Sequence, residues 1–92
     1  MGLMMLINYD PFLNNLPIID VHWYNRDMIR YILNDFINDN LKLKNNKIII
    51  VHGKGQGILK NEIHAILKKD KRISRYYLDG FNIGQTIIEL KR

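Results

Sequence analysis

The sequence contains no cysteine, which excludes disulfide bonds, thiolate metal sites and a cysteine nucleophile. Long apolar runs are also missing. Residues 1–7 are apolar, but this run is much shorter than the ~20 residues that span a bilayer. It also lacks the basic flank and the cleavage site of a signal peptide. These absences predict a cytoplasmic protein that has no membrane partner.

Acidic residues are fewer than basic ones: 9 Asp and Glu stand against 14 Lys and Arg, for a formal net charge of +5. An excess of this size suits an anionic partner, and nucleic acid is the commonest one. Many small proteins carry such a charge for solubility alone, so charge decides nothing by itself. The chain of 92 residues, 47% of them hydrophobic, can form one domain with a modest core. An active site would have to lie at the edge of that single fold.

Proline is rare, and both prolines lie within the first 17 residues. Pro17 has no N–H to donate to a sheet, which predicts that the first strand, residues 18–22, begins directly after it. We take residues 1–17 as an N-terminal extension and residues 18–92 as the domain. Four consecutive β-branched residues, Ile48–Val51, predict a second strand over residues 47–51 that is buried on both faces.

Two segments repeat apolar residues at helical spacing. The first helix is expected to begin after Asn25 as its N-cap, with Asp27 in its first turn. The second is expected over residues 59–69. Residues 38–40 weaken the first helix, and Asn45–Asn46 marks a turn. The expected buried residues are Met28, Ile29, Ile32, Leu33, Phe36 and Ile37 in the first helix, and Leu59, Ile63, Ile66 and Leu67 in the second.

Further strands are expected over residues 73–78 and 85–90, joined by a turn over residues 79–84. The order is then βαβαββ. Two successive strand–helix–strand units predict parallel pairing, and the short last connection predicts an antiparallel pair. The predicted fold class is α/β, in the form of an α+β two-layer sandwich: a mixed four-stranded sheet with two helices.

Polar residues are expected to gather where the first two strands end. Parallel strands end at the same edge of a sheet, and these two lead into His22 and His52. Asp20 lies two residues before His22, so the two side chains share a face. Provided that the two strands are close neighbours, Asp20, His22 and His52 meet in one crevice.

The loop at this edge, His52-Gly53-Lys54-Gly55-Gln56-Gly57, is rich in glycine. Glycine allows sharp turns and a close approach of the backbone to a ligand. Free N–H groups at the start of the following helix, together with Lys54, favour a phosphate group. The pattern is neither GxxxxGK[ST] nor GxGxxG, which disfavours a nucleoside triphosphate or dinucleotide pocket. The alternative interpretation is that these glycines only close a turn.

Three segments in this order resemble the motifs of the Smr (small MutS-related) family: Ile19-Asp20-Val21-His22, the glycine loop, and Gly84-Gln85-Thr86. The resemblance runs from about Ile18 to Leu90. It implies a βαβαββ two-layer sandwich, binding to nucleic acid and, in many members, endonuclease activity on DNA or RNA. Smr domains occur alone or at the C-terminus of MutS-like proteins. The expected partners are therefore DNA or RNA, a ribosome or a MutS-like ATPase, and the expected state is a monomer.

The resemblance supplies most of the candidate site residues. Asp20, His22 and His52 are the catalytic candidates, and Gly53, Lys54, Gly55 and Gly57 are candidates for binding nucleic acid. Two further binding candidates come from the residues themselves: Lys60 through its charge beside the loop, and Trp23 through its aromatic ring. A histidine can act as general base or acid near neutral pH. Lys54 and the loop amides can stabilise charge in the transition state, and Asp20 can orient His22 or bind a metal.

Carboxylates near this edge are too few for a two-metal centre. They are Asp20 and, in the first turn of the second helix, Glu62. No residue is assigned as a metal ligand with certainty. One loosely bound Mg²⁺ or Mn²⁺, or attack by an RNA 2′-hydroxyl without metal, fits the residues better. The alternative functions are a non-catalytic nucleic-acid or ribosome-binding adaptor and a protein-interaction module.

The sequence departs from the family pattern at two places: Trp23 stands where a glycine is usual, and Phe81-Asn82 stand where a glycine pair is usual. Trp23 could crowd a phosphate, stack on an unpaired base, which contributes ~1–3 kcal/mol, or pack against the first helix. His64 is expected to be a surface residue. A basic surface is expected along the second helix and past its end, formed by Lys60, Lys68, Lys69, Lys71 and Arg72.

Overall fold

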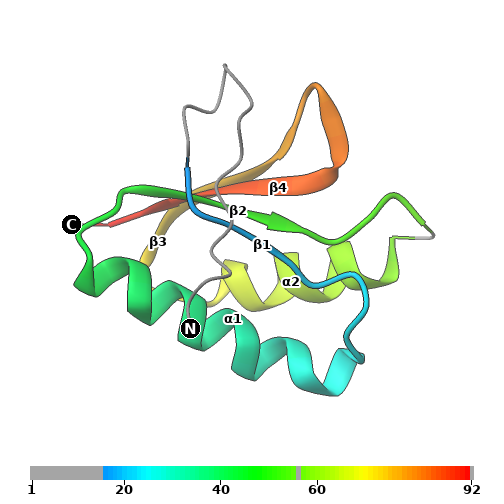
Figure 1. Cartoon of the computed structure of the whole chain (residues 1–92), viewed down its shortest axis with the longest axis horizontal. Coiled ribbons are helices and arrows are strands. Elements are labelled where there is room, and N and C mark those ends of the chain that lie inside the picture. The colour runs from blue at the N-terminus through cyan, green and yellow to red at the C-terminus, as the bar shows by residue number, and fades with distance from the viewer. Residues whose placement is uncertain (1–15, 56, 92) are drawn as a thin grey trace.

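Strands and helices follow one another in the predicted order βαβαββ. The computed structural model describes residues 16–55 and 57–91. Both helices cover the same side of the sheet, which gives the two layers seen in Figure 1. The elements are β1 (Ile18–Asp20), α1 (Arg26–Lys42), β2 (Lys47–Val51), α2 (Ile58–Lys68), β3 (Ile73–Asp79) and β4 (Asn82–Leu90). The expected N-terminal extension lies almost wholly outside the described residues.

The first two strands are parallel neighbours, as the argument about their shared edge requires. Asp20 of β1 is paired with Val51 of β2. The strand begins directly after Pro17, whose carbonyl accepts a hydrogen bond from the N–H of Ile49 at 2.9 Å. Proline lacks a donor but keeps its acceptor. The strand is two residues shorter than predicted, because the chain turns at once: the N–H of Tyr24 bonds to the carbonyl of Val21 at 3.0 Å.

The sheet order is β1-β2-β4-β3, and here one prediction is wrong. The second strand–helix–strand unit does not form a parallel pair, because β4 lies between β2 and β3 and is antiparallel to both. The connection from β3 to β4 is shorter than expected, and β4 begins at Asn82 rather than at residue 85. The last strand is therefore central, and its first residues lie beside the glycine loop.

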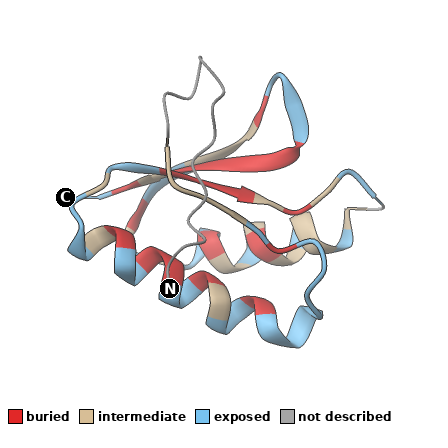
Figure 2. Cartoon of the chain, in the orientation of Figure 1, coloured by how far each residue is buried: buried red, intermediate tan, exposed pale blue. Residues whose placement is uncertain are grey.

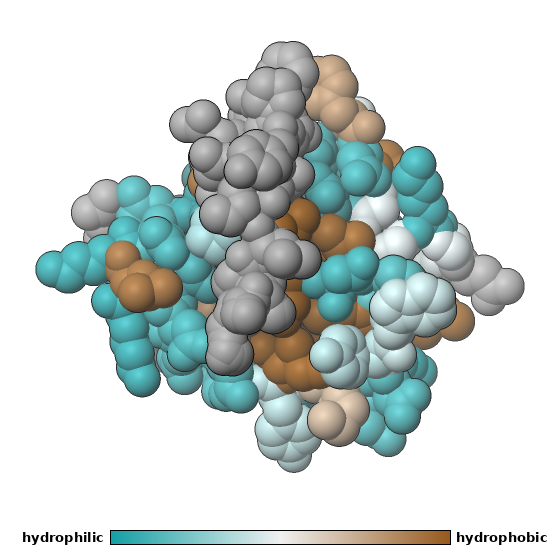
Figure 3. All heavy atoms as spheres, in the orientation of Figure 1, coloured by the Kyte–Doolittle hydropathy of each residue, from teal (hydrophilic) through white to brown (hydrophobic). Residues whose placement is uncertain are grey.

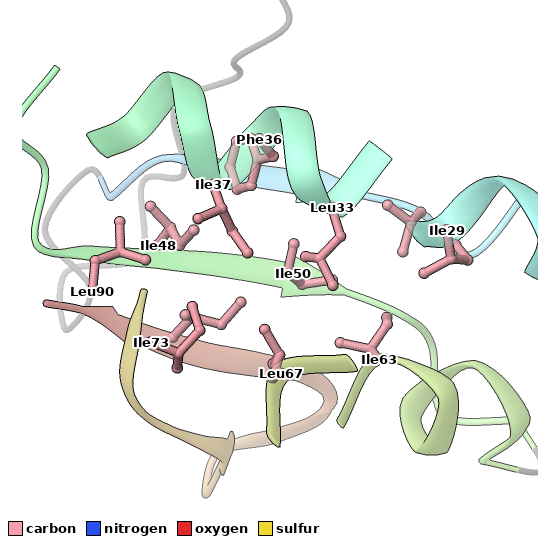
Figure 4. Close-up of a cluster of buried hydrophobic side chains, with 12 residues drawn as sticks. Ile29, Leu33, Phe36, Ile37, Ile48, Ile50, Ile63, Leu67, Ile73 and Leu90 are labelled. Carbon is pink, nitrogen blue, oxygen red and sulfur yellow. The ribbon is translucent and has the colours of Figure 1, made fainter. Parts of the chain in front are cut away.

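The core fills the space between the sheet and the two helices (Figure 4), where side chains of α1, α2 and the strands point toward one another. Ile48 and Ile50 of β2 face the helices within this cluster. Ile49 is equally inaccessible, at 0% exposed, and it points to the opposite face of the sheet because side chains alternate along a strand. This confirms that β2 is buried on both faces. Figure 2 shows the buried residues along the strands and on the sheet-facing sides of the helices.

Helix α1 begins at Arg26, directly after the predicted N-cap Asn25, but it differs from the prediction in its first buried residue and near its C-terminus. Met28, expected in the core, is 47% exposed, because the buried residues follow one narrower stripe that starts at Ile29. At the other end the helix continues through Asn40, which is buried. The Asn40 amide donates to the carbonyl of Phe36 at 2.8 Å, and its side-chain oxygen accepts from Asn45 at 2.8 Å. These bonds satisfy the polar group that was expected to weaken the helix.

One face of the molecule is seen in Figure 3, which shows hydrophobic atoms gathered near its middle and mostly hydrophilic atoms around them. Within residues 16–55 and 57–91, neither helix has the length and apolar character needed to cross a membrane.

Candidate functional site

Three connections lie on the same side of the molecule, on the right in Figure 1: β1 to α1, β2 to α2, and β3 to β4. The second of these connections is bonded through its backbone to β4. The carbonyl of Gly84 accepts hydrogen bonds from the N–H groups of His52 and Gly53, each at 2.9 Å. A Cβ atom at residue 84 would lie 3.1 Å from Lys54 Cγ and 3.4 Å from the carbonyl carbon of Gly53. Glycine at this position therefore lets the glycine loop lie directly against β4.

Asp20 and His22 form a hydrogen-bonded pair at the end of β1. The Asp20 carboxylate accepts from the backbone N–H of His22 at 3.0 Å and from the ring nitrogen Nδ1 of the same residue. A carboxylate accepts but does not donate, so Nδ1 carries the proton in the neutral imidazole. Nε2 is then the nitrogen that can take up a proton. The side chains of His22 and Asp20 are 34% and 50% exposed, so a ligand can reach the pair.

The glycine loop lies directly beside His22. A Cβ atom built on Gly53 would lie 3.4 Å from His22 Cβ, and the φ angle of Gly53 is +89°. Residues other than glycine rarely adopt this angle. Lys54 and Gly55 are exposed, and Gly57 is the N-cap of α2, with φ +81°. The loop thus contacts an accessible histidine through Gly53, carries Lys54, and leads into α2.

His52 is turned away from that pair. It is 4% exposed, and its Nε2 lies 2.8 Å from Thr86 Oγ1. The expectation that its ring shares a crevice with Asp20 is wrong, because side chains alternate along a strand. Asp20 is paired with Val51, on the face opposite the helices, and His52 follows Val51 and points back toward the helix layer. The two strands do end at one edge, but only His22 and the loop backbone meet there.

His64 is the residue that sequence reasoning missed. It was expected at the surface, but its Nε2 lies 2.8 Å from Thr86 Oγ1. Its ring centroid is 4.9 Å from that of Tyr76 and 6.2 Å from that of His52. The one signal in the sequence is its spacing: His64 lies three residues before the buried Leu67, at the border between the buried and the exposed side of the helix. The pairing of β4 with β2, which the sequence did not show, puts Thr86 beneath it.

The three side chains form one directed chain of hydrogen bonds. His52 Nδ1 lies 3.0 Å from the carbonyl oxygen of Gly53, so this nitrogen donates and Nε2 must accept. The Thr86 hydroxyl then donates to His52 and accepts from Nε2 of His64. His52 must be neutral in this arrangement, because its Nε2 accepts a hydrogen bond. Thr86, 0% exposed, therefore links α2 to the backbone of the glycine loop.

Burial has the largest effect on the pKa of His52 and lowers it. The hydrogen bond to the Gly53 carbonyl opposes this by raising the pKa, and the nearby charge of Lys60 lowers it by a smaller amount. Burial also lowers the pKa of His64, helped by His52 and Lys60. Protonation of His52 would turn its acceptor nitrogen into a second donor facing Thr86. The lowered pKa values therefore agree with the neutral chain of hydrogen bonds.

We expect the free energy of unfolding to decrease as the pH falls through 6.5, the ordinary histidine value. Histidines with a lowered pKa in the folded state bind more protons when unfolded, so acid favours unfolding in this interval. Urea unfolding at a series of pH values measures the effect. His64→Gln should reduce the pH dependence, because one of the two groups is removed. A free energy that is flat, or that rises toward acid, would contradict this account.

The remaining candidates are more dispersed. Lys60 is half-buried on α2, near enough to both inner histidines to lower their pKa values. Glu62 is not part of the edge site, since it pairs with Arg26 at 3.2 Å.

The basic run after α2 is partly structural: Arg72 bonds to Asp70 at 2.6 Å and to Asn38 at 2.7 Å. Trp23 is 84% exposed, which excludes close packing against α1.

Metal-ligating side chains are sparse at this site. In the described part of the chain, no three His, Cys, Asp or Glu side chains are grouped so that they could hold one ion. The accessible donors at the edge are Asp20 and His22. Two donors do not form a resident metal site, although Mg²⁺ is often bound by one or two carboxylates together with substrate phosphates.

Comparison with known proteins agrees with the three motifs. The profile of the Smr domain matches residues 19–91. The chain is 36% identical over 76 residues to endonuclease MutS2 of Finegoldia magna, covering 79% of this chain and 10% of the relative. It is 45% identical over 64 residues to endonuclease MutS2 of Borreliella burgdorferi, covering 61% of this chain and 8% of the relative. The chain thus spans about a tenth of these relatives.

Solved structures confirm the fold. The Smr domain of Thermus thermophilus MutS2 superposes with a TM-score of 0.78 at 20% identity, covering 82% of this chain and 98% of that one. YdaL, a stand-alone small MutS-related protein from Escherichia coli, superposes with a TM-score of 0.77 at 17% identity, covering 82% of this chain and 64% of that one. Together with the match to the family profile over residues 19–91, these findings show that the chain belongs to the Smr domain family.

Proposed function

We propose that this chain is an endonuclease that cleaves phosphodiester bonds of nucleic acid at the edge formed by Asp20, His22 and the glycine loop. The observation that carries the proposal is the accessible Asp20–His22 pair in contact with the glycine loop. Two relatives are named endonuclease MutS2, and their naming supports the same activity.

His22 acts as the general base in this proposal. Its Nε2 takes the proton of the attacking oxygen, which belongs to water or, in RNA, to the neighbouring 2′-hydroxyl. That oxygen then forms a bond to phosphorus, the bond to the 5′-oxygen breaks, and the 5′-oxygen takes up a proton. Asp20 holds the imidazole in the required tautomer and stabilises its positive charge after proton transfer.

The glycine loop binds the phosphate group. Lys54 brings a full positive charge, and the start of α2 adds the partial positive charge of a helix N-terminus. Both favour the negative charge that grows on the phosphoryl oxygens in the transition state. His52 does not contact the substrate in this scheme. It positions the loop through its bonds to Gly53 and Thr86.

The test is incubation of the chain with end-labelled single-stranded RNA, duplex DNA and branched DNA, with and without Mg²⁺ or Mn²⁺. We expect cleavage products from at least one substrate. Analysis of their ends identifies the attacking oxygen, since a 2′,3′-cyclic phosphate forms only when the RNA 2′-hydroxyl attacks. Binding without product on every substrate and metal would contradict the proposal and support the adaptor instead.

We predict that Gly55→Asp weakens binding to nucleic acid at least tenfold without loss of fold. No atom lies within 4 Å of a Cβ built at this position, so the side chain fits. Its negative charge, however, would stand beside Lys54 and repel phosphate. Fluorescence anisotropy with a labelled oligonucleotide measures the change, and Gly55→Asn is the uncharged control. Equal weakening by both variants would point to shape rather than charge and contradict the prediction.

A further inference from the structure

Trp23 stands out among the exposed aromatic side chains because of its position. Exposed hydrophobic residues are common on soluble proteins when they occur singly. The exposure of Trp23, 84%, therefore does not by itself indicate a binding role. Its ring, however, lies against the ring of His22, with centroids 4.2 Å apart and planes inclined at 43°. The proposed general base and the exposed indole therefore form one continuous aromatic surface.

The backbone under Trp23 is held firmly. Val21 is 2% exposed, and its N–H bonds to the carbonyl of Val51 at 2.8 Å, which ties the turn to β2. The next turn bond joins Tyr24 to Val21 at 3.0 Å. The indole is thus presented outward from an anchored turn, and tryptophan has few side-chain torsions to order on binding.

The charges around this surface identify the kind of ligand. Lys54 is exposed and lies on the loop whose Gly53 contacts His22. An aromatic face beside a loop that carries a lysine matches a nucleotide, which offers a flat base and a phosphate group on one unit. In a duplex, neighbouring base pairs cover the faces of each base. Only a base that has left the stack can lie on the indole.

We propose that Trp23 is a stacking platform that makes this site selective for unpaired nucleotides. A base stacks on the indole while its phosphate group contacts the Lys54 loop, which brings the phosphodiester next to Nε2 of His22. The inference rests on the proposed function, because it assumes that nucleic acid binds at this edge. It adds the substrate class: single-stranded nucleic acid, or an unpaired nucleotide within a duplex.

The test uses the fluorescence of Trp23, which is the single tryptophan of the chain. The probes are a short oligothymidylate, an abasic chain of the same length and phosphate number, and a duplex, all titrated in EDTA at low salt. We expect the oligothymidylate to quench the indole and to bind about 5- to 150-fold more tightly than the abasic chain, the factor that stacking of one base supplies.

Variants separate stacking from charge. Anisotropy with labelled probes should show that Trp23→Ala binds the oligothymidylate and the abasic chain equally, whereas Trp23→Phe keeps part of the preference. Tyr31→Ala is the matched control, because Tyr31 is an aromatic residue of α1, 67% exposed, outside the site. We expect it to leave the preference unchanged.

The outcomes distinguish the two proposals. If wild-type protein binds the oligothymidylate, the abasic chain and the duplex equally, or if Trp23→Ala keeps the preference, the stacking platform is overturned while binding at the edge stands. If none of the probes binds, the proposed function and this inference both fall.

Discussion

Replacing His22 with alanine is expected to reduce the rate of cleavage by about 10²- to 10⁴-fold, the contribution of a positioned general acid or base. The side chain is accessible, and its bonds are made to Asp20, so its removal leaves the core intact. Asp20→Asn should also slow cleavage strongly, because an amide cannot stabilise the protonated imidazole and can favour the wrong tautomer. The measurement is the single-turnover rate on whichever substrate the chain cleaves.

Controls are needed to show that a slower rate reflects lost catalysis rather than lost folding or lost binding. Circular dichroism and thermal unfolding should show that both variants remain folded, and oligonucleotide binding should change little, because Lys54 and the loop are unaltered. Asp35→Asn removes an exposed carboxylate of α1 away from the edge and should leave the rate unchanged. Unchanged cleavage by both the His22 and the Asp20 variant would exclude this pair as the catalytic centre.

Replacing Thr86 with valine should lower the free energy of unfolding by about 2–4 kcal/mol. Valine fills the same space but has no hydroxyl, so Nε2 of His52 and Nε2 of His64 lose the partner they share. An unsatisfied buried polar group costs about 1–3 kcal/mol, and the cost at His64 lies toward the lower end of that range because this residue is only half-buried. A loss of this size is a large part of the ~5–15 kcal/mol that stabilises an ordinary domain. Urea unfolding at neutral pH measures it.

Thr86→Ser is the matched control. Serine keeps the hydroxyl and removes one buried methyl group, which costs about 1 kcal/mol. We therefore expect the serine variant to be more stable than the valine variant. Because Thr86 holds the loop through His52, the valine variant should also cleave more slowly than the serine variant. The reverse order of stability would show that the methyl contact, and not the hydrogen-bond chain, is the important feature of this residue.

The sequence predicted the elements of the fold well because their signals are local. The helical spacing of apolar residues in α1 and α2, the β-branched run in β2 and the position of Pro17 each depend on near neighbours along the chain. The place of β4 between β2 and β3 does not. The strand order depends on whether β3 or β4 pairs with β2, and no local pattern in residues 73–90 indicates which of the two does.

The same limit explains the outcome at the site. The approach of His22 to the glycine loop followed from parallel strands that end together. The direction of His52 relative to Asp20 depended on the register between β1 and β2: Asp20 pairs with Val51, so the next side chain, His52, points to the helix layer on the opposite face. His64 acquires its place only through Thr86 of β4, so its role followed from the strand order that the sequence did not show.

The most direct test of the account is a titration of the ¹⁵N-labelled chain with a short single-stranded oligonucleotide, followed by NMR. We predict chemical-shift changes concentrated at the edge site, at Asp20, His22, Trp23, Gly53, Lys54 and Gly55. The competing surface is the groove between the helices, which is lined by Arg30, Lys69 and Lys71 among others. Changes confined to that groove, or no changes at all, would contradict the central claim that this edge binds nucleic acid.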